Sequence, residues 1–150
     1  NINKSNTKLP DFNGDNKTNT NLIDIPLVGN IAAGSPIDAI YNENEKINVP
    51  TFLLGKGSYF ALNIIGDSMI DVGINEGDIA IIKQKNNANN GDLVAALIDD
   101  TETTLKRFKR LGPKIILEAE NKNYKSQVYE SGSNIKIQGI LSGLIRKYNS

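Results

Sequence analysis

The feature that most limits the possible folds of this chain is its division into short apolar runs rich in β-branched residues, each followed by turn-forming residues. Such runs are typical of β-strands, and the Gly, Pro, Asn and Asp between them are typical of hairpins and tight bends. We expect strands over 23–33, 46–50, 58–65, 79–83, 93–98, 103–110, 114–118, 126–129 and 134–145. No segment has the periodicity of a long amphipathic helix. The sequence therefore predicts an all-β fold, a compact domain of short, strongly bent strands and hairpins.

The first 21 residues differ in composition from the rest of the chain. They contain seven asparagines and show neither apolar periodicity nor enough hydrophobic mass to form a core. We expect a flexible linker over 1–21 and one folded domain over 22–150. A linker at this position predicts a further domain upstream, and a plain disordered tail is the alternative.

Composition excludes several classes of site and partner. Seventeen basic residues balance seventeen acidic ones, so no overall field attracts the chain to nucleic acid or to an anionic membrane. The chain has no cysteine and no histidine, which excludes disulfides, thiolate sites and the common zinc sites. We expect no metal and no cofactor. No apolar run is long enough to span a bilayer and no secretion signal is present, so we expect a cytoplasmic protein with no membrane partner.

A candidate nucleophile follows the run that ends at Ile65. There the chain reads Gly66-Asp67-Ser68-Met69, a glycine bend with a serine two positions later. With no histidine or cysteine in the chain, a base for this serine must be a carboxylate or a lysine kept neutral by burial. The alternative is that Gly66 and Ser68 only shape a turn.

Lys106 is the candidate base. It lies in the middle of an expected strand, on the same face as Thr104 and Phe108 at a period of two, and a face shared with a phenylalanine can be buried. A solvated lysine has a pKa near 10.4 and is a poor base at neutral pH. The alternative is a solvated basic edge that Lys106 forms with Arg107, Lys109 and Arg110.

A possible cleavage site follows the first expected strand. Ala33 and Gly34 have almost no side chain to obstruct a narrow active-site cleft, and Pro36 follows closely. The pair is either a site of proteolysis or a surface turn.

Taken in order, these residues resemble a known family. The resemblance is carried by Pro26-Leu27-Val28-Gly29, Ala32-Ala33-Gly34, Gly66-Asp67-Ser68-Met69, Gly73-Ile74, Gly77-Asp78, Asn90-Gly91 and Thr104-Leu105-Lys106-Arg107. They look like the self-cleaving C-terminal domain of LexA-type repressors, a family that includes CI-like phage repressors and UmuD-type proteins and is distantly similar to signal peptidases. The resemblance covers residues 25–148, and it implies the β fold of those domains.

The resemblance also implies roles for individual residues. Ser68 would be the nucleophile and Lys106 the base of a Ser-Lys dyad that cuts the Ala33-Gly34 bond of its own chain. Backbone amides of Asp67 and Ser68 would hold the oxyanion.

Partners are implied in the same way. The resembling repressors are cleaved when they meet a RecA filament on single-stranded DNA, and they form homodimers, here through the last expected strand, 134–145. Operator DNA would be bound only through an N-terminal domain that this sequence lacks, because it has no helix-turn-helix stretch. The alternatives are a UmuD-like or phage-repressor autoprotease, or an inert dimerisation module of the same fold.

Overall fold

The computed structural model of this protein describes residues 21–30 and 45–148, and within them it is an all-β fold. Nine strands and two short 3-10 helices are present, and no α-helix occurs in these residues. The strands are β1 (Leu22–Asn30), β2 (Lys46–Pro50), β3 (Tyr59–Asn63), β4 (Ile79–Gln84), β5 (Leu93–Ile98), β6 (Glu102–Leu111), β7 (Lys114–Glu118), β8 (Gln127–Tyr129) and β9 (Ile135–Ile145). The helices are η4 (Thr51–Leu53) and η5 (Ile70–Val72). The predicted fold class is confirmed.

The strands begin and end close to where the sequence predicts. β5 and β7 match the expected ranges 93–98 and 114–118, and β6 is longer by one residue at each end. The first run is a strand only as far as Asn30, while the rest of its expected range, 31–33, lies outside the described residues. Residues 1–20 also lie outside them, so the linker stays a prediction.

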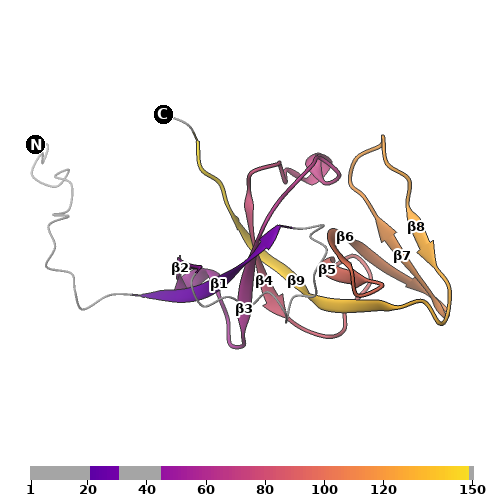
Figure 1. The fold of residues 1–150 in the computed structure, drawn as a ribbon, viewed down its shortest axis with the longest axis horizontal. Helices are drawn as coiled ribbons and strands as arrows, with labels where there is room; N and C mark the ends of the chain where they lie inside the picture. The colour runs from indigo at the N-terminus through magenta and orange to yellow at the C-terminus, as the bar shows by residue number, and fades with distance from the viewer. Residues whose placement is uncertain (1–20, 31–44, 149–150) are drawn as a thin grey trace, which may run out of the picture.

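The strands form one mixed sheet in the order β2-β1-β3-β4-β9-β5-β6-β7-β8. All neighbouring pairs are antiparallel except β1 and β3, which are parallel. β9 joins the two halves, because residues 135–140 pair with β5 and residues 139–145 pair with β4. Figure 1 shows β9 as a long strand that runs from the group of β5 to β8 toward the group of β1 to β4.

Gly139 lies where β9 passes from one half of the sheet to the other. It pairs with both Gln84 of β4 and Ala95 of β5. A Cβ atom at this position would lie 2.3 Å from the backbone oxygen of Lys83 and 2.5 Å from Cγ2 of Ile82. Only glycine allows the strands to approach so closely.

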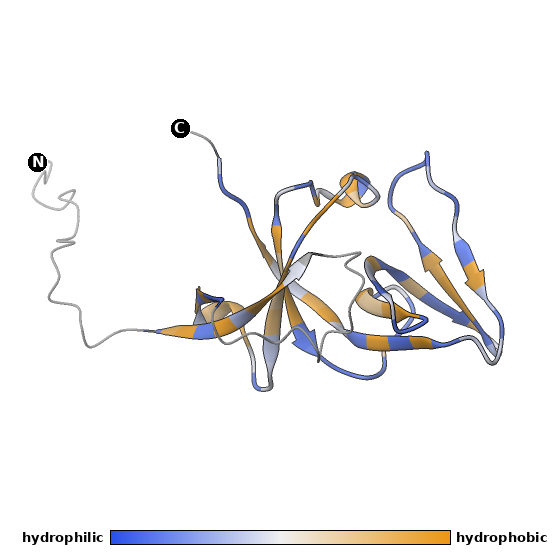
Figure 2. Ribbon diagram, viewed as in Figure 1, coloured by the Kyte–Doolittle hydropathy of each residue, from blue (hydrophilic) through white to orange (hydrophobic). Residues whose placement is uncertain are grey.

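The apolar residues fill three clusters rather than one. The cluster beside the candidate nucleophile contains Met69 together with Phe60, Leu62, Ile82 and Leu105. A second lies among β1 to β4 and contains Val49 and Ile81, and a third lies under β5 to β7 and contains Val94, Phe108 and Leu117. Figure 2 shows apolar and polar residues alternating along β9, the pattern of a strand with one covered face. No helix in the described part of the chain is long and apolar enough to cross a membrane.

Candidate active site

Ser68 lies in the loop between β3 and β4, and hydrogen bonds join the two ends of this loop. The Ile64 N–H donates to the carbonyl of Asp78 at 2.9 Å, and the Gly77 N–H donates back to the carbonyl of Ile64 at 2.9 Å. Gly66 has a φ of 85°, a left-handed conformation that favours glycine. Met69 is buried in the first apolar cluster, so the residue after Ser68 anchors the loop while Ser68 itself stays half-buried.

The structure brings Lys106 to this serine across 38 positions of sequence. The Nζ of Lys106 lies 3.2 Å from Oγ of Ser68. The same Nζ lies 2.6 Å from Oγ1 of Thr104 and 3.3 Å from the carbonyl oxygen of Leu105. Every contact is to a neutral oxygen, and no carboxylate of a described residue forms an ion pair with this amine.

The surroundings of Lys106 favour its neutral form. Burial lowers the pKa of the Lys106 ammonium from its usual value, and the negative charge of Glu102 opposes this shift in pKa. The neutral fraction near pH 7 is therefore larger than for a solvated lysine, and a neutral amine can accept a proton from a hydroxyl.

A cleft of about 170 Å³ opens at this pair. The cleft is lined by the loop that carries Ser68, by β6 and by one residue of the segment between β7 and β8: Ile64–Met69, Glu102, Thr104–Lys106 and Tyr124. The geometry combines a hydroxyl, an amine with a lowered pKa and a cleft that opens beside both.

The predicted oxyanion donors are at the rim of this cleft. Neither the Asp67 N–H nor the Ser68 N–H donates a hydrogen bond to any residue within 21–30 or 45–148. Among the described residues both amides therefore lack an acceptor, and their role as oxyanion donors stays a prediction. Ala33 and Gly34, the predicted cleavage site, lie outside the described residues.

Several neighbours of the site were not identified from sequence. The period-two spacing predicts that Thr104 shares a face with Lys106, and this signal could have suggested its contact with the amine. The segment 120–124 had no such signal, since it is polar and without periodicity. It nevertheless contacts the nucleophile loop: the Tyr124 hydroxyl donates to Oδ1 of Asp67 at 2.5 Å, and this hydrogen bond raises the pKa of Tyr124.

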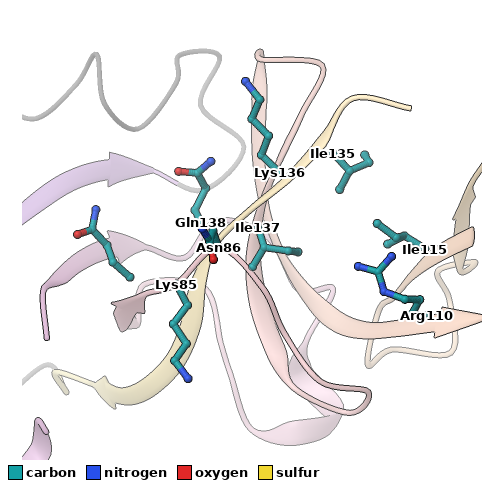
Figure 3. A pocket seen from close by; sticks show the side chains of 9 residues that line it. Lys85, Asn86, Arg110, Ile115, Ile135, Lys136, Ile137 and Gln138 are labelled. Atoms are coloured by element: carbon teal, nitrogen blue, oxygen red, sulfur yellow. The ribbon is translucent and has the colours of Figure 1, made fainter. Parts of the chain in front are cut away.

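A wider hollow of about 750 Å³ lies elsewhere, between β4, the start of β9 and the strands β6 and β7. Its cations are Lys85, Arg110 and Lys136, and Lys136 is already paired with Asp100 at 2.9 Å. Figure 3 shows Lys85 and Lys136 pointing in opposite directions, so their charges do not converge on one point. In the described ranges, no group of three acidic side chains is placed to hold a metal ion.

Comparison with known proteins agrees with the geometry. The family model described as Peptidase S24-like matches residues 26–142. A LexA repressor from Pelagibacter ubique (strain HTCC1062) is 47% identical over 131 residues, which are 87% of this chain and 58% of that protein. A LexA repressor from Cereibacter sphaeroides (strain ATCC 17029 / ATH 2.4.9) is 50% identical over 127 residues, 84% of this chain and 56% of that protein. The chain therefore spans less than two thirds of the length of these relatives. The resemblance to LexA-type C-terminal domains is confirmed.

Proposed function

The chain belongs to the Peptidase S24-like family, and from this premise we propose that it is the C-terminal autoproteolytic and dimerisation domain of a LexA-like SOS repressor. It would be a serine endopeptidase whose substrate is its own Ala33-Gly34 bond. Cleavage would separate the domain from an upstream DNA-binding domain and so end repression.

One observation carries the proposal: Nζ of Lys106 lies 3.2 Å from Oγ of Ser68. This distance is within hydrogen-bond reach for proton transfer between a nucleophile and its base. The lowered pKa of Lys106 supports the same roles, because only the neutral amine can remove the proton.

The reaction needs no group beyond these two side chains, the backbone amides and water. The hydroxyl oxygen of Ser68 attacks the carbonyl carbon of Ala33 while its proton passes to Nζ of Lys106. The oxyanion is held by the amides of Asp67 and Ser68. The bond to the Gly34 nitrogen then breaks as Lys106 returns the proton to that amine. Water, deprotonated by Lys106, hydrolyses the ester, which leaves a carboxyl group on Ala33 and restores Ser68.

Binding of the substrate segment would activate the base. A segment that covers the cleft excludes water from Lys106 and lowers the pKa of its amine further. When the cleft is open, water reaches the amine, which becomes protonated and cannot act as a base. Because the segment belongs to the same chain, its effective concentration at the serine is high once it is positioned. A partner that binds the covered form more tightly would switch cleavage on.

We propose the RecA filament on single-stranded DNA as that partner, as the resemblance implies. Operator DNA would be bound only through the upstream domain, and the repressor would act in the cytoplasm.

The proposed homodimer would use β9. Residues 141–145 pair only with β4 within the described residues, and the opposite backbone edge of this part of β9 is where a second copy would pair.

Mass spectrometry of the purified chain at mildly alkaline pH tests the proposal. We expect two fragments that meet at Ala33-Gly34, slower production near neutrality, and no cleavage in Ser68→Ala or Lys106→Ala. A wild-type chain that stays intact, with and without a RecA filament, would instead identify an inert dimerisation module. Fragments that meet elsewhere would refute the assigned bond. A UmuD-like or phage-repressor autoprotease would cleave equally well, and the sequence upstream of residue 1 distinguishes these.

A further inference from the structure

The segment that follows β7 holds the backbone on both sides of Ser68. The side-chain Nδ2 of Asn121 donates to the carbonyl oxygen of Asp67 at 2.8 Å, across 54 positions of sequence. The Glu120 N–H donates to the carbonyl oxygen of Ser68 at 2.8 Å. The two peptide groups that flank the Ser68 Cα atom are therefore both fixed from the same side.

Asn121 is itself held in one orientation. It is one of the few buried polar residues, with an exposed fraction of 5%. Its Oδ1 accepts a hydrogen bond from the Asn123 N–H at 2.9 Å, so both ends of the side-chain amide are used. Oδ1 faces a donor and Nδ2 faces an acceptor, and this pattern fixes which end of the amide points to Asp67.

The position of the Asp67 carbonyl determines the position of the Ser68 N–H. They belong to one peptide group, all peptide bonds of the described residues are trans, and in a trans peptide the two point in opposite directions. Because the carbonyl points to Asn121, the Ser68 N–H points away from it. That N–H donates no hydrogen bond to any described residue, and Ser68 lines the cleft. The Asp67 carbonyl also accepts a hydrogen bond from the Ile70 N–H, but this bond is longer, at 3.4 Å.

We infer that Asn121 is a positioning residue that orients the Asp67–Ser68 peptide so that the Ser68 N–H can donate to the oxyanion of the cleavage reaction. This inference rests on the proposed function. Asn121 contacts neither the hydroxyl of Ser68 nor the amine of Lys106, so it acts through the backbone alone. Loss of its amide would leave a nucleophile and base that still meet but an oxyanion donor that is no longer fixed.

The test is self-cleavage of the full chain carrying Asn121→Asp or Asn121→Ala. Asn121→Asp keeps the size of the side chain and an acceptor for the Asn123 N–H but removes the donor to Asp67. We expect the maximal rate to fall at least about tenfold in both variants, since loss of an oxyanion donor outright costs about 10² to 10³. In Asn121→Ala, which adds no charge near Lys106, the pH midpoint of the rate should stay that of wild type. Asn123→Ala is the control, as only the backbone of Asn123 is used, and it should cleave at the wild-type rate.

A second readout separates this role from docking of the substrate segment. A small fluorophosphonate forms a bond from its phosphorus to an activated serine oxygen and loses fluoride. Its phosphoryl oxygen, on which negative charge builds up in the transition state, then lies where the oxyanion forms. Its labelling of Ser68, measured below the unfolding midpoint of each variant, should slow by the same factor as cleavage. Labelling or cleavage of Asn121→Asp at the wild-type rate would overturn the inference. A shifted pH midpoint in Asn121→Ala, or equal slowing in Asn123→Ala, would also overturn it. A wild-type chain that is neither cleaved nor labelled would refute the proposed function instead.

Discussion

Oγ1 of Thr104 lies 2.6 Å from Nζ of Lys106, closer than the 3.2 Å between that Nζ and Oγ of Ser68. Thr104 is two positions before Lys106 on β6, and its side chain is buried. The hydroxyl accepts a hydrogen bond from the amine and so limits the directions in which Nζ can point. The threonine thus acts on the base rather than on the nucleophile.

Thr104→Val should slow self-cleavage about tenfold, which corresponds to about 1.4 kcal/mol and is the usual value of one hydrogen bond. Valine has almost the same shape but offers no acceptor, so the amine becomes less well oriented toward Ser68. Thr104→Ser keeps the hydroxyl and should restore most of the rate. Fragment production followed by mass gives the comparison, and a Thr104→Val chain that cleaves like wild type would show that the contact has no role.

Thr103 gives a contrasting prediction, although it is the next residue of the same strand. Its side chain is buried, and its Oγ1 has no hydrogen-bond partner among the residues that the structure describes. Because a buried hydroxyl without a partner costs stability, Thr103→Val should raise the free energy of unfolding by about 1 kcal/mol and leave cleavage unchanged. Urea denaturation of Thr103→Val in a Ser68→Ala background measures this gain. A loss of stability would mean that the hydroxyl has a partner in solution.

Most of the strands, and the candidate residues Ser68 and Lys106, can be predicted from the sequence. Alternation and turn residues predicted β5 and β7 at their observed ends, because short runs between strong turn signals leave little freedom in register. The period of two also placed Thr104 and Lys106 on one face. The meeting of Lys106 with Ser68 came from the family resemblance, since nothing local in the sequence specifies which strand the serine loop contacts.

The support for the nucleophile loop was not accessible in this way. Asn121 and Tyr124 lie in a polar segment with no apolar period, and they contact Asp67 across 54 and 57 positions. Such contacts depend on how β7 and β8 place the connecting segment over the sheet. A single sequence does not encode that placement in any local pattern.

Burial of Lys106 predicts a pH dependence of stability. The pKa of Lys106 is lowered in the folded state, so between that pKa and its usual value of about 10.4 the unfolded chain binds more protons. Below the pKa that Lys106 has in the folded state, the folded chain bears the full free-energy cost of burying the charge. This cost disappears as the pH rises past the pKa that Lys106 has in the unfolded chain. In a Ser68→Ala background, which prevents cleavage, the Lys106 chain should therefore gain stability relative to Lys106→Met as pH rises. Urea denaturation across the alkaline range measures the free energy of unfolding of both chains. A difference between them that does not change with pH would contradict the prediction.

Glu102 should tune the pH at which cleavage begins. Its negative charge raises the pKa of Lys106 against the effect of burial. Glu102→Gln removes that charge, so the pKa of Lys106 falls further and the midpoint of the pH–rate profile moves to lower pH. The shift should shrink at high salt, because Glu102 is exposed and its field is screened. Glu130→Gln, which removes a carboxylate paired with Lys114 outside the cleft, should leave the midpoint in place. Equal profiles for Glu102→Gln and wild type would refute the coupling.

The crossing point of β9 predicts a strong effect of one added methyl group. In Gly139→Ala the new Cβ would lie 2.3 Å from the backbone oxygen of Lys83, and backbone cannot move aside as a flexible side chain can. The strand must shift against β4, at a cost of about 1 to 3 kcal/mol in the free energy of unfolding. Gly143 lies on the same strand with no atom within 4 Å of the equivalent position, so Gly143→Ala should change stability by less than about 0.5 kcal/mol. Urea denaturation of the two variants in a Ser68→Ala background makes the comparison. Equal stability would mean that β9 and β4 are further apart in solution than this sheet requires, because only a close backbone approach distinguishes the two glycines.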